Sequence, residues 1–489
     1  MTTPETKEAP KVPGYRITET RIPGLVVIER PPSSDDRGFF REVWRESVME
    51  EAGIHLGPCQ WSHSRSKTGV LRAIHAEKWD KLVYPTTGKM YGAIVDLRPA
   101  SRTFGQFEEF NFDCSGDNYP DKALFLPNGM GNSICAVEGP VEYHYLVNQY
   151  WTPDSTFAVR WDDPDIAIPW PVKDPILTPK DRESKSLREQ FDYMFKPMAI
   201  LGGSGLVGSM ALETLRQKGV DFDAPPRSEV DITNKEAVDK WMAGIASESV
   251  VLFSAWTDVD GAEKDPEGAM SVNLTGTTNV AEAANKYGKH LIYISTDFVF
   301  PGTEEKPGPY DENQPGNPHS DDIGAYAVSK ALGEKEVLGI ADSYTIIRIS
   351  YPFGNPHSPK DFALKTLSLI DKGHPLFDDQ VFTPTYIPDL VAAVRYLGGK
   401  KVKGIFHVAC QPPTTPYEFG SYLAMKLGKN VEIKRGSMKD FLAAPGRTKR
   451  PLKGGLKTQL SDRDLARPST DWQRAIDDFV QRLNPEGRA

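Results

Sequence analysis

Tyr326 and Lys330 are four residues apart in the sequence Y-A-V-S-K. Because a helix has about 3.6 residues per turn, this spacing puts both side chains on one face. A free tyrosine has a pKa of ~10 and a neighbouring ammonium favours the phenolate, so we expect Lys330 to lower the pKa of Tyr326. Such a pair can give a proton to a carbonyl oxygen while a hydride reaches the carbon. The pair alone is common by chance, and it becomes informative beside a nicotinamide site.

A glycine-rich turn upstream of this pair predicts that site. Gly202, Gly205 and Gly208 form the pattern G-x-x-G-x-x-G between an apolar run and a helical segment. Glycine lets the backbone approach a pyrophosphate, whose charge then lies at the helix N-terminus. We therefore expect NADPH or NADH as the cofactor. Asp223 could hold a ribose 2'-hydroxyl and Arg227 a 2'-phosphate, and we favour NADPH. A glycine turn that binds no nucleotide is the alternative.

A second set of candidate residues lies in the N-terminal half. His75, Arg72 and Lys81 lie on segments that we expect to line a barrel. Inward basic groups are costly unless an anionic ligand or an enolate meets them, which favours a functional His75 over a structural one. A metal site is the alternative, because the surrounding spacing is similar to the two metal motifs of cupins. Glu77 and Asn132 stand where those motifs have histidine, so we expect no metal.

Length, charge and cysteine content limit the class of protein. A chain of 489 residues is too long for one core and indicates two or three domains. The net charge of -9 argues against nucleic acid or anionic membranes as partners. The four cysteines show no C-x-x-C spacing, which favours a reducing compartment. No apolar run approaches the ~20 residues of a membrane span. We expect a cytoplasmic protein.

The pattern of apolar residues changes once along the chain. Residues 1–12 are polar and are expected to form a disordered tail. Residues 13–190 contain short apolar runs broken by Gly, Pro, Asp and Asn, which are typical of an all-β sandwich or barrel. Residues 191–196 are expected to be a linker. Residues 197–489 alternate strands with helices, which predicts a doubly wound parallel sheet, followed by a small substrate lobe.

Three segments carry more specific expectations. Residues 180–196 are dense in charge and are expected to hold the last helix of the first half and the linker. In the second half, residues 266–287 are expected to form a helix and residues 344–349 a strand.

The C-terminal half resembles the extended short-chain dehydrogenase/reductase superfamily, and within it the dTDP-4-dehydrorhamnose reductases. The motifs are "DIT", "ISTDFVF", "YAVSKALGE", "RISYPFG" and "FTPTYIPDL". The resemblance implies a Rossmann fold in which Tyr326 protonates the C4 oxygen and Lys330 binds the nicotinamide ribose. Thr296 would hydrogen-bond the ketone, with Ser295 as the rival. The implied cofactor-binding residues are Gly202, Gly205, Gly208, Asp231, Ile232, Ala255, Tyr326 and Lys330.

Two departures from this family affect the expected sugar site. Phe298 replaces the usual Tyr of "STDYVF", and Tyr351 replaces the usual Trp of "RISYPFG". We expect Tyr351 to contact the substrate, so these changes bear on the specificity for the sugar rather than on hydride chemistry.

The N-terminal half resembles the dTDP-4-dehydrorhamnose 3,5-epimerases, which are metal-independent cupin-like jelly-roll barrels. The motifs include "DDRGFFRE", "GVLRAIH", "DKLV", "RWDDPDIAIPWP" and "LTPKD". The resemblance implies that His75 is the base, that Asp181 orients it, that Tyr145 is the opposing acid and that Lys81 stabilises an enolate oxygen. The implied substrate-binding residues are Arg37, Phe40, Glu42, Gln60, Arg72 and Asn132. Arg37 and Arg72 would take the diphosphate and Phe40 would stack on the base. Asn132 replaces a family histidine, so epimerisation could be reduced from two centres to one.

Together the resemblances imply two successive steps in one chain. They predict an enzyme that epimerises dTDP-4-dehydro-6-deoxy-D-glucose and then reduces its C4 ketone to give dTDP-L-rhamnose. The expected partner is a nucleotide-sugar substrate, and dimeric relatives imply a homodimer through the epimerase domain. One alternative is the same pair of steps on a UDP- or GDP-linked sugar. The other is a non-catalytic regulatory protein, which would not need to keep Tyr326, Lys330, His75 and Asp181 together.

Overall fold

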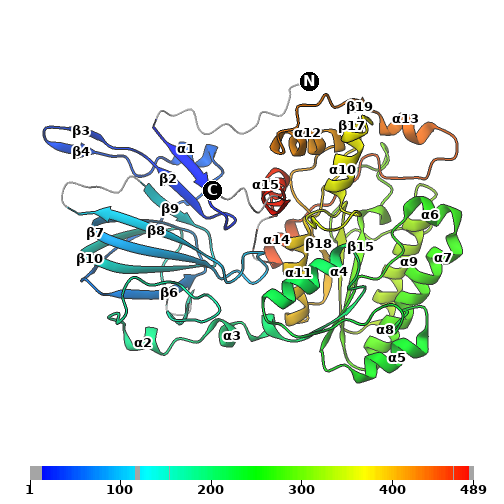
Figure 1. Cartoon of the computed structure of the whole chain (residues 1–489), viewed down its shortest axis with the longest axis horizontal. Helices are drawn as coiled ribbons and strands as arrows, with labels where there is room; N and C mark the ends of the chain where they lie inside the picture. The colour runs from blue at the N-terminus through cyan, green and yellow to red at the C-terminus, as the bar shows by residue number, and fades with distance from the viewer. Residues whose placement is uncertain (1–13, 116–121, 153–154, 466, 468, 484–489) are drawn as a thin grey trace. The chain divides into compact units, whose positions relative to one another are not determined.

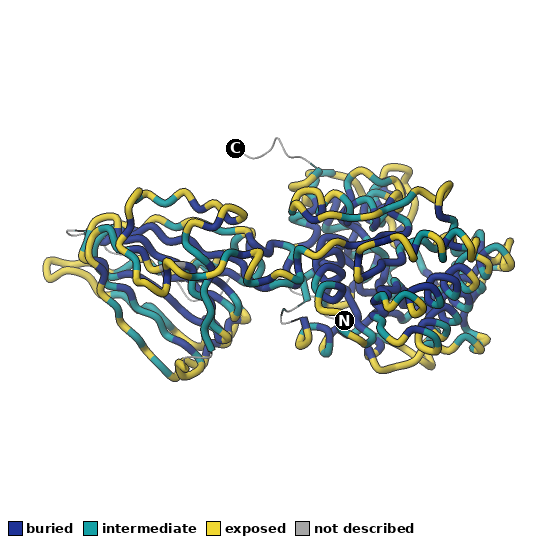
Figure 2. Tube along the Cα trace, turned by 90° about the horizontal axis from the view of Figure 1, so that it is seen from below, coloured by how far each residue is buried: buried dark blue, intermediate teal, exposed yellow. Residues whose placement is uncertain are grey.

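The computed structural model describes residues 14–115, 122–152, 155–465, 467 and 469–483. The chain divides into two compact units, one made of Met1–Arg98 with Thr103–Asp192, the other of Pro99–Arg102 with Tyr193–Ala489. Figure 2 shows that buried segments run through the interior of each unit. The predicted tail, residues 1–12, lies outside the described residues.

The first unit is dominated by antiparallel β structure, with short helices (Figure 1). Its elements are β1 Arg16–Glu19, β2 Val26–Glu29, β3 Ser33–Asp35, β4 Gly38–Phe40, α1 Glu46–Glu51, β5 Gln60–Ser66, β6 Leu71–Glu77, β7 Lys81–Asp96, β8 Phe107–Cys114, β9 Lys122–Leu126, β10 Met130–Val147, β11 Thr156–Val159, α2 Pro179–Arg182 and α3 Leu187–Gln190. Nine strands form one sheet in the order β1-β2-β9-β7-β10-β6-β11, with β5 on β10 and β8 on β7, while β3 and β4 form a separate hairpin.

The long strand β10 shapes this sheet because it changes partners along its length. Its first part pairs with β6, its last part pairs with β5, and the register against β7 shifts between Ala136 and Tyr143. Such bulges bend a strand. Along β7, Val83 packs in one apolar cluster whereas Leu82 and Tyr84 pack in another, as the alternation of side chains requires.

The second unit is built on a six-stranded parallel sheet. Its elements are β12 Met198–Leu201, α4 Leu206–Gln217, β13 Phe222–Asp223, α5 Lys235–Gly244, β14 Ser249–Leu252, α6 Val259–Lys264, α7 Pro266–Met270, the π-helical turn η3 Ser271–Gly276, α8 Thr277–Lys286, β15 His290–Thr296, the 3-10 turn η4 Asp297–Val299, α9 Ala325–Ile340, β16 Tyr344–Ile349, α10 Phe362–Asp371, β17 Leu376–Phe377, α11 Ile387–Lys400, β18 Gly404–His407, α12 Pro416–Lys426, β19 Arg435–Gly436, α13 Met438–Ala443, α14 Gln459–Asp464 and α15 Trp472–Leu483, with the 3-10 turn η2 Asp192–Phe195 at the junction. The strand order is β13-β12-β14-β15-β16-β18.

Helices cover both faces of the parallel sheet (Figure 1). Helices α4 and α11 pack on one face, and α5, α8 and α9 pack on the other. The strand β12 is therefore apolar along its whole length, and all four of its residues are buried. Among the described residues, no helix combines the length and the apolar character that a membrane crossing needs.

Candidate active sites

His75 and Asp181 are brought together in the first unit. His75 lies on β6, directly opposite Asn132 of β10, and its Nε2 is 2.7 Å from Oδ1 of Asp181. Thr178 caps α2 by accepting a hydrogen bond from the backbone N–H of Asp181, which fixes the carboxylate at the helix start. Burial raises the pKa of Asp181, but hydrogen bonds from His75 and Thr178 leave it below its usual value. The carboxylate thus accepts the Nε2 proton and leaves Nδ1 able to act as a base.

Lys81 and Glu77 form an ion pair close to this histidine. Lys81 begins β7 and its side chain is only 5% exposed, while that of Glu77 is 15% exposed. Glu77 follows His75 by two positions on β6, so both side chains lie on the same face of the strand. Burial lowers the pKa of Lys81, although the Glu77 carboxylate counteracts that effect. From the sequence, Glu77 was considered only as a residue in place of a metal-ligating histidine, and its pairing with Lys81 was not predicted.

Three further polar groups lie on β10 near this pair. The hydroxyl of Tyr143 donates to Asn132 Oδ1 at 3.1 Å, and the rings of Tyr143 and Tyr145 are 6.2 Å apart. Burial raises the pKa of Tyr143, and the Glu77 carboxylate adds to that rise despite the bond to Asn132. Tyr145 is half-buried on the same face of β10 as Tyr143. A basic imidazole, a buried ammonium and phenols can together move a proton at a carbon beside a carbonyl.

Two of the residues expected to bind the diphosphate and the nucleobase lie outside the nine-stranded sheet. Arg37 and Phe40 lie on the β3–β4 hairpin, which extends away from the rest of the unit (Figure 1), and Phe40 is 77% exposed. Arg37 is paired with Asp35. Arg72 is exposed on β6 and donates to Ser66 Oγ and Arg65 O, and its place in the site beside His75 stays a prediction.

Two other predicted substrate residues are held by local contacts. Glu42 accepts a hydrogen bond from the Tyr15 hydroxyl at 2.9 Å and also pairs with Arg45. Gln60 begins β5, and its Oε1 accepts from the backbone N–H of Trp151 at 3.1 Å.

In the second unit, the glycine turn joins β12 to α4 as the sequence predicts. Gly202 has φ +95°, a conformation that favours glycine, and a side chain there would meet the backbone of Ser254. A Cβ atom at Gly208 would lie 2.2 Å from the carbonyl oxygen of Gly202. Gly205 caps α4 without a side chain of its own. The first N–H groups of α4 are thus left accessible to an anion, which fits a pyrophosphate.

Tyr326 and Lys330 lie in the first turns of α9 at the carboxyl end of β15. Both are buried, and Lys330 Nζ donates to the carbonyl of Ile294 at 2.8 Å and lies 4.0 Å from the centroid of the Tyr293 ring. Burial raises the pKa of Tyr326 to about 12, although a hydrogen bond with Thr296 counteracts it. Burial also lowers the pKa of Lys330 to about 7. The expected lowering of the Tyr326 pKa by Lys330 is not seen in this structure, where burial and the Asp297 carboxylate raise it and only the Thr296 hydroxyl lowers it.

Thr296 rather than Ser295 is the hydroxyl that interacts with the tyrosine. Thr296 ends β15, and its Oγ1 accepts from the backbone N–H of Phe298. The Oγ of Ser295 is buried and finds no hydrogen-bond partner among the residues that the structure describes.

A carboxyl group that was not predicted lies beside this hydroxyl. Asp297 is buried and its Oδ2 accepts a hydrogen bond from Ser350 Oγ at 2.7 Å. Burial raises the pKa of Asp297 to about 7, although the bonds from Ser350 and Thr296 counteract the rise. The signal was present in the sequence, since Asp297 follows Thr296 at the end of a strand.

The two positions that depart from the reductase family lie together. The Phe298 ring is 5.7 Å from the Tyr326 ring and 6.0 Å from the Tyr351 ring. The Tyr351 hydroxyl accepts a hydrogen bond from Gln380 Nε2 at 2.8 Å. Tyr351 is thus held near Tyr326 by Phe298 and Gln380.

Three other residues predicted to bind the cofactor lie in the loops that follow β13 and β14. Asp231 accepts from Thr233 and pairs with Arg227 at 2.9 Å, while Ile232 is buried. Ala255 follows the end of β14. Asn273, which was not predicted, ties this loop to α9, because its side chain bonds both the backbone of Trp256 and Ser329 Oγ.

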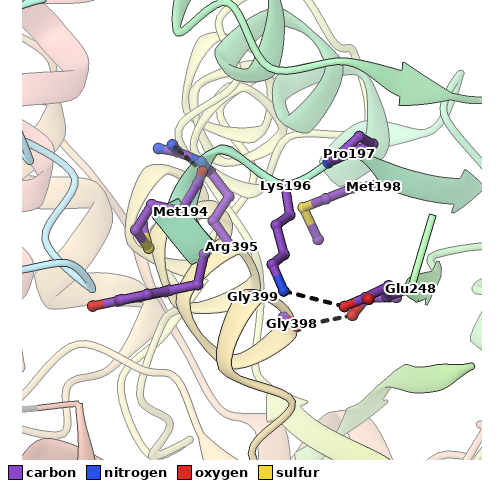
Figure 3. A pocket seen from close by; sticks show the side chains of 10 residues that line it. Met194, Lys196, Pro197, Met198, Glu248, Arg395, Gly398 and Gly399 are labelled. Atoms are coloured by element: carbon purple, nitrogen blue, oxygen red, sulfur yellow. Dashed lines mark hydrogen bonds and ion pairs between the residues drawn. The ribbon is translucent and has the colours of Figure 1, made fainter. Parts of the chain in front are cut away.

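A small pocket in the second unit contains none of these residues. Figure 3 shows its walls, which include Met194, Lys196, Met198 and Glu248, with Lys196 Nζ 3.2 Å from Glu248 Oε2. Met198 begins β12, so the pocket lies at the amino end of that strand. Ligands of parallel sheets bind at the carboxyl ends, where Gly202 and Thr296 lie.

Two family models match this chain. The model described as the RmlD substrate binding domain matches residues 196–484, and the model described as dTDP-4-dehydrorhamnose 3,5-epimerase matches residues 19–189. The relatives fall into the same two groups. A dTDP-4-dehydrorhamnose reductase of Mycolicibacterium smegmatis is 30% identical over 307 residues, which are 62% of this chain and 90% of the relative. A dTDP-4-dehydrorhamnose 3,5-epimerase of Pseudomonas aeruginosa is 34% identical over 179 residues, which are 36% of this chain and 97% of the relative.

Solved structures agree for the C-terminal half. A crystal structure of dTDP-4-dehydrorhamnose reductase from Bacillus anthracis in complex with NADP matches with a TM-score of 0.53 and 26% identity. The match covers 58% of this chain and 99% of that chain.

Proposed function

The chain belongs to the dTDP-4-dehydrorhamnose 3,5-epimerase family in its N-terminal part and to the RmlD substrate binding domain family in its C-terminal part, and from this we propose that it is a bifunctional enzyme. It is an isomerase and an oxidoreductase of dTDP-L-rhamnose synthesis. The first unit epimerises dTDP-4-dehydro-6-deoxy-D-glucose at C3 and C5. The second unit reduces the C4 ketone with NADPH.

The epimerisation uses the acidity of hydrogens beside a ketone. His75 Nδ1 takes the proton from the carbon, and the electron pair of the broken C–H bond moves to the C4 oxygen. The Lys81 ammonium stabilises that enolate oxygen. Tyr145 returns a proton to the opposite face of the carbon, which inverts the centre. Asp181 holds the imidazole in the tautomer that this step needs, as the 2.7 Å contact supports.

The reduction needs a hydride donor and a proton donor at the same carbonyl. NADPH, when bound, supplies the hydride to C4, and the glycine cradle at Gly208 with the free N-terminus of α4 fits its pyrophosphate. Tyr326 gives its phenolic proton to the C4 oxygen, and Thr296 donates a hydrogen bond to the same atom. Lys330 holds the nicotinamide ribose and, when charged, favours the loss of the phenolic proton.

Arg227 supports NADPH over NADH. Its side chain is exposed at the adenosine end of the predicted cofactor site, whereas Asp223 already accepts a hydrogen bond from Trp241 Nε1 at 2.9 Å. Arg227 is paired with Asp231 through its Nε, but its side chain is 79% exposed, so the rest of its guanidinium would be available to a 2'-phosphate.

The finer features of the fold are part of this proposal. The bent antiparallel sheet of the first unit supports a cupin-like jelly-roll barrel over residues 13–190. The six-stranded parallel sheet with helices on both faces supports a Rossmann domain over residues 197–489, with a substrate lobe and with residues 191–196 as the linker. A homodimer forms through the epimerase domain, where the exposed aromatic hairpin of β3 and β4 offers an apolar surface. The protein works in the cytoplasm, as the cysteine pattern predicts.

The alternatives are less well supported. A UDP- or GDP-linked substrate is not favoured, because the relatives in both halves carry dTDP in their names. A non-catalytic binding role would not require a hydrogen-bonded His75–Asp181 pair together with Tyr326 and Thr296 in contact.

The observation that carries the proposal is the presence of both proton-transfer groups in one chain. In D2O without cofactor, the 4-keto sugar should incorporate deuterium at C3 and C5, as followed by NMR. Given the epimerised keto sugar, the protein should oxidise NADPH. If deuterium is not incorporated, the epimerase assignment is wrong, and if NADPH is not consumed, the reductase assignment is wrong.

A further inference from the structure

A carboxylate lies inside the proposed epimerisation site without a role in the reaction described above. Glu77 is on β6, two positions after His75, and its carboxylate contacts the Lys81 ammonium at the start of β7. The two side chains are 15% and 5% exposed. An ammonium that is so well shielded from water is strongly destabilised unless an anion compensates it.

The surroundings leave Glu77 as the anion that compensates Lys81. The position opposite Lys81 on β9 is Leu126, and the position opposite Glu77 on β11 is Thr156. On β10 the titratable neighbours are the phenols of Tyr143 and Tyr145. The carboxylate of Asp181 on α2 is engaged by His75, and that of Asp80, next to Lys81 in the chain, accepts from the backbone of Asn128 and the side chain of Asn148.

We propose that Glu77 is a positioning residue of the epimerisation site, which holds the Lys81 ammonium in place and keeps it protonated. The inference rests on the proposed epimerase function. When His75 takes the carbon-bound proton, the electron pair moves to the C4 oxygen and Lys81 meets it as a cation that keeps its proton. A neutral amine would offer a weaker hydrogen bond and no charge. Glu77 thus acts through Lys81 and does not itself accept the substrate proton.

The test is the pH dependence of deuterium exchange in the full chain. The pKa of a buried lysine falls when its carboxylate partner is removed, so Lys81 of Glu77→Gln is charged at low pH and neutral at high pH. Exchange by this variant should therefore fall as pH rises from about 6 to 9, by about tenfold per unit once Lys81 loses its proton. The wild-type protein should show no such fall over this range. Glu77→Asp should restore much of the wild-type profile.

Glu138→Gln is the matched control, because Glu138 of β10 pairs with Lys89 of β7 in the same unit, but at the exposed surface. It removes one carboxylate of a Glu–Lys pair and should keep the wild-type profile. A Glu77→Gln profile with the wild-type shape, whether at full rate or uniformly reduced, would overturn the proposal. In Lys81→Met, the added Glu77→Gln should cause no further loss of exchange, and a further loss would equally overturn it. The double variant removes both charges. Its comparison with Lys81→Met therefore serves where Glu77→Gln alone does not fold.

The two levels of the hypothesis fail differently. If wild-type protein does not exchange deuterium at all, the epimerase function is wrong. If it exchanges and only the Glu77→Gln profile is unaltered, the role of Glu77 is wrong. NADPH oxidation with epimerised substrate reports on the second unit and should be the same in all these variants.

Discussion

His75 and Asp181 are 106 residues apart in the sequence and 2.7 Å apart in the structure. The contact matters because a carboxylate acceptor on Nε2 decides which ring nitrogen is free. The N-cap by Thr178 fixes Asp181 in the first turn of a four-residue helix, so the orientation of the imidazole depends on a local hydrogen bond as well as on the sheet. The proposed base of the first reaction is therefore oriented by two elements that are distant in sequence.

Replacing His75 by Ala should separate the two activities. Deuterium exchange into the keto sugar should fall by at least about a hundredfold, because general base catalysis contributes on that scale. NADPH oxidation with epimerised substrate should be unchanged. His55→Ala is the control, since His55 is exposed in the same unit. Retention of exchange in His75→Ala would mean that another group is the base.

Replacing Tyr326 by Phe should have the converse effect. The variant lacks the phenolic proton, so NADPH oxidation should fall by about a hundredfold or more while exchange continues. Tyr344→Phe is the matched control, because Tyr344 lies on β16 in the same unit, and it should keep the wild-type rate. Equal loss in both variants would point to a structural effect instead.

At this scale, sequence reasoning predicted which residues meet but not their environment. The resemblance implied the His75–Asp181 contact, and the spacing of Tyr326 and Lys330 predicted a shared helix face. The direction of the Tyr326 pKa was wrong because burial, which raises it, depends on distant packing. Glu77 was not predicted as the ion-pair partner of Lys81, because neither the residue pattern nor the spacing shows that this site is shielded from water.

The elements differ in how far local pattern determines them. The run 344–349 was predicted as a strand and is observed as β16, Tyr344–Ile349, because a short segment rich in β-branched residues favours a buried strand. By contrast, residues 266–287 were predicted as one helix, and the structure has α7, the π-helical turn η3 and α8. The turn η3 contains Asn273, whose side chain bonds Ser329 of α9. A tertiary contact of this kind cannot be recognised from the periodicity of apolar residues in the sequence.

The segment before the parallel sheet gives a second difference. We predicted one terminal helix within residues 180–196, and the structure has two short helices, α2 and α3. Ser186 forms a capping box with Glu189, so a new helix begins there instead of the first one continuing. The capping signal was present in the sequence and was not used.

The glycine turn allows a prediction at the level of the element. Gly208→Ala should destabilise the second unit by about 1–3 kcal/mol, because its Cβ would collide with backbone atoms that cannot move aside. It should also weaken NADPH binding, since the turn must open. The measurements are urea unfolding and NADPH titration. Gly244→Ala is the control, because nothing lies within 4 Å of a Cβ atom there, and unaltered binding and stability in Gly208→Ala would contradict the assigned cradle.

On the scale of the whole molecule, each unit has its own sheet, apolar clusters and proton-transfer groups. The change from antiparallel to parallel sheets falls near Pro197, where the sequence pattern also changes. This boundary was visible because the period of apolar residues differs between the two halves. Short strands in the first half did not reveal that β7 and β10 are each continuous over 16 and 18 residues, because their bulges interrupt the alternation.

The products of the two units suggest why they share a chain. Epimerisation through an enolate is reversible, whereas hydride transfer from NADPH withdraws the epimerised ketone. Covalent linkage raises the local concentration of the intermediate without any new contact. The order of the steps is fixed by chemistry, because reduction of the C4 ketone removes the acidity of the C3 and C5 hydrogens.

The most direct measurement is a single conversion in D2O. Full-length protein is incubated with dTDP-4-dehydro-6-deoxy-D-glucose and NADPH, and the product is identified by NMR and mass spectrometry. The account predicts dTDP-L-rhamnose with deuterium at C3 and C5 and protium from NADPH at C4. A C4-reduced sugar without deuterium at C3 and C5, or an exchanged ketone that is never reduced, would contradict it.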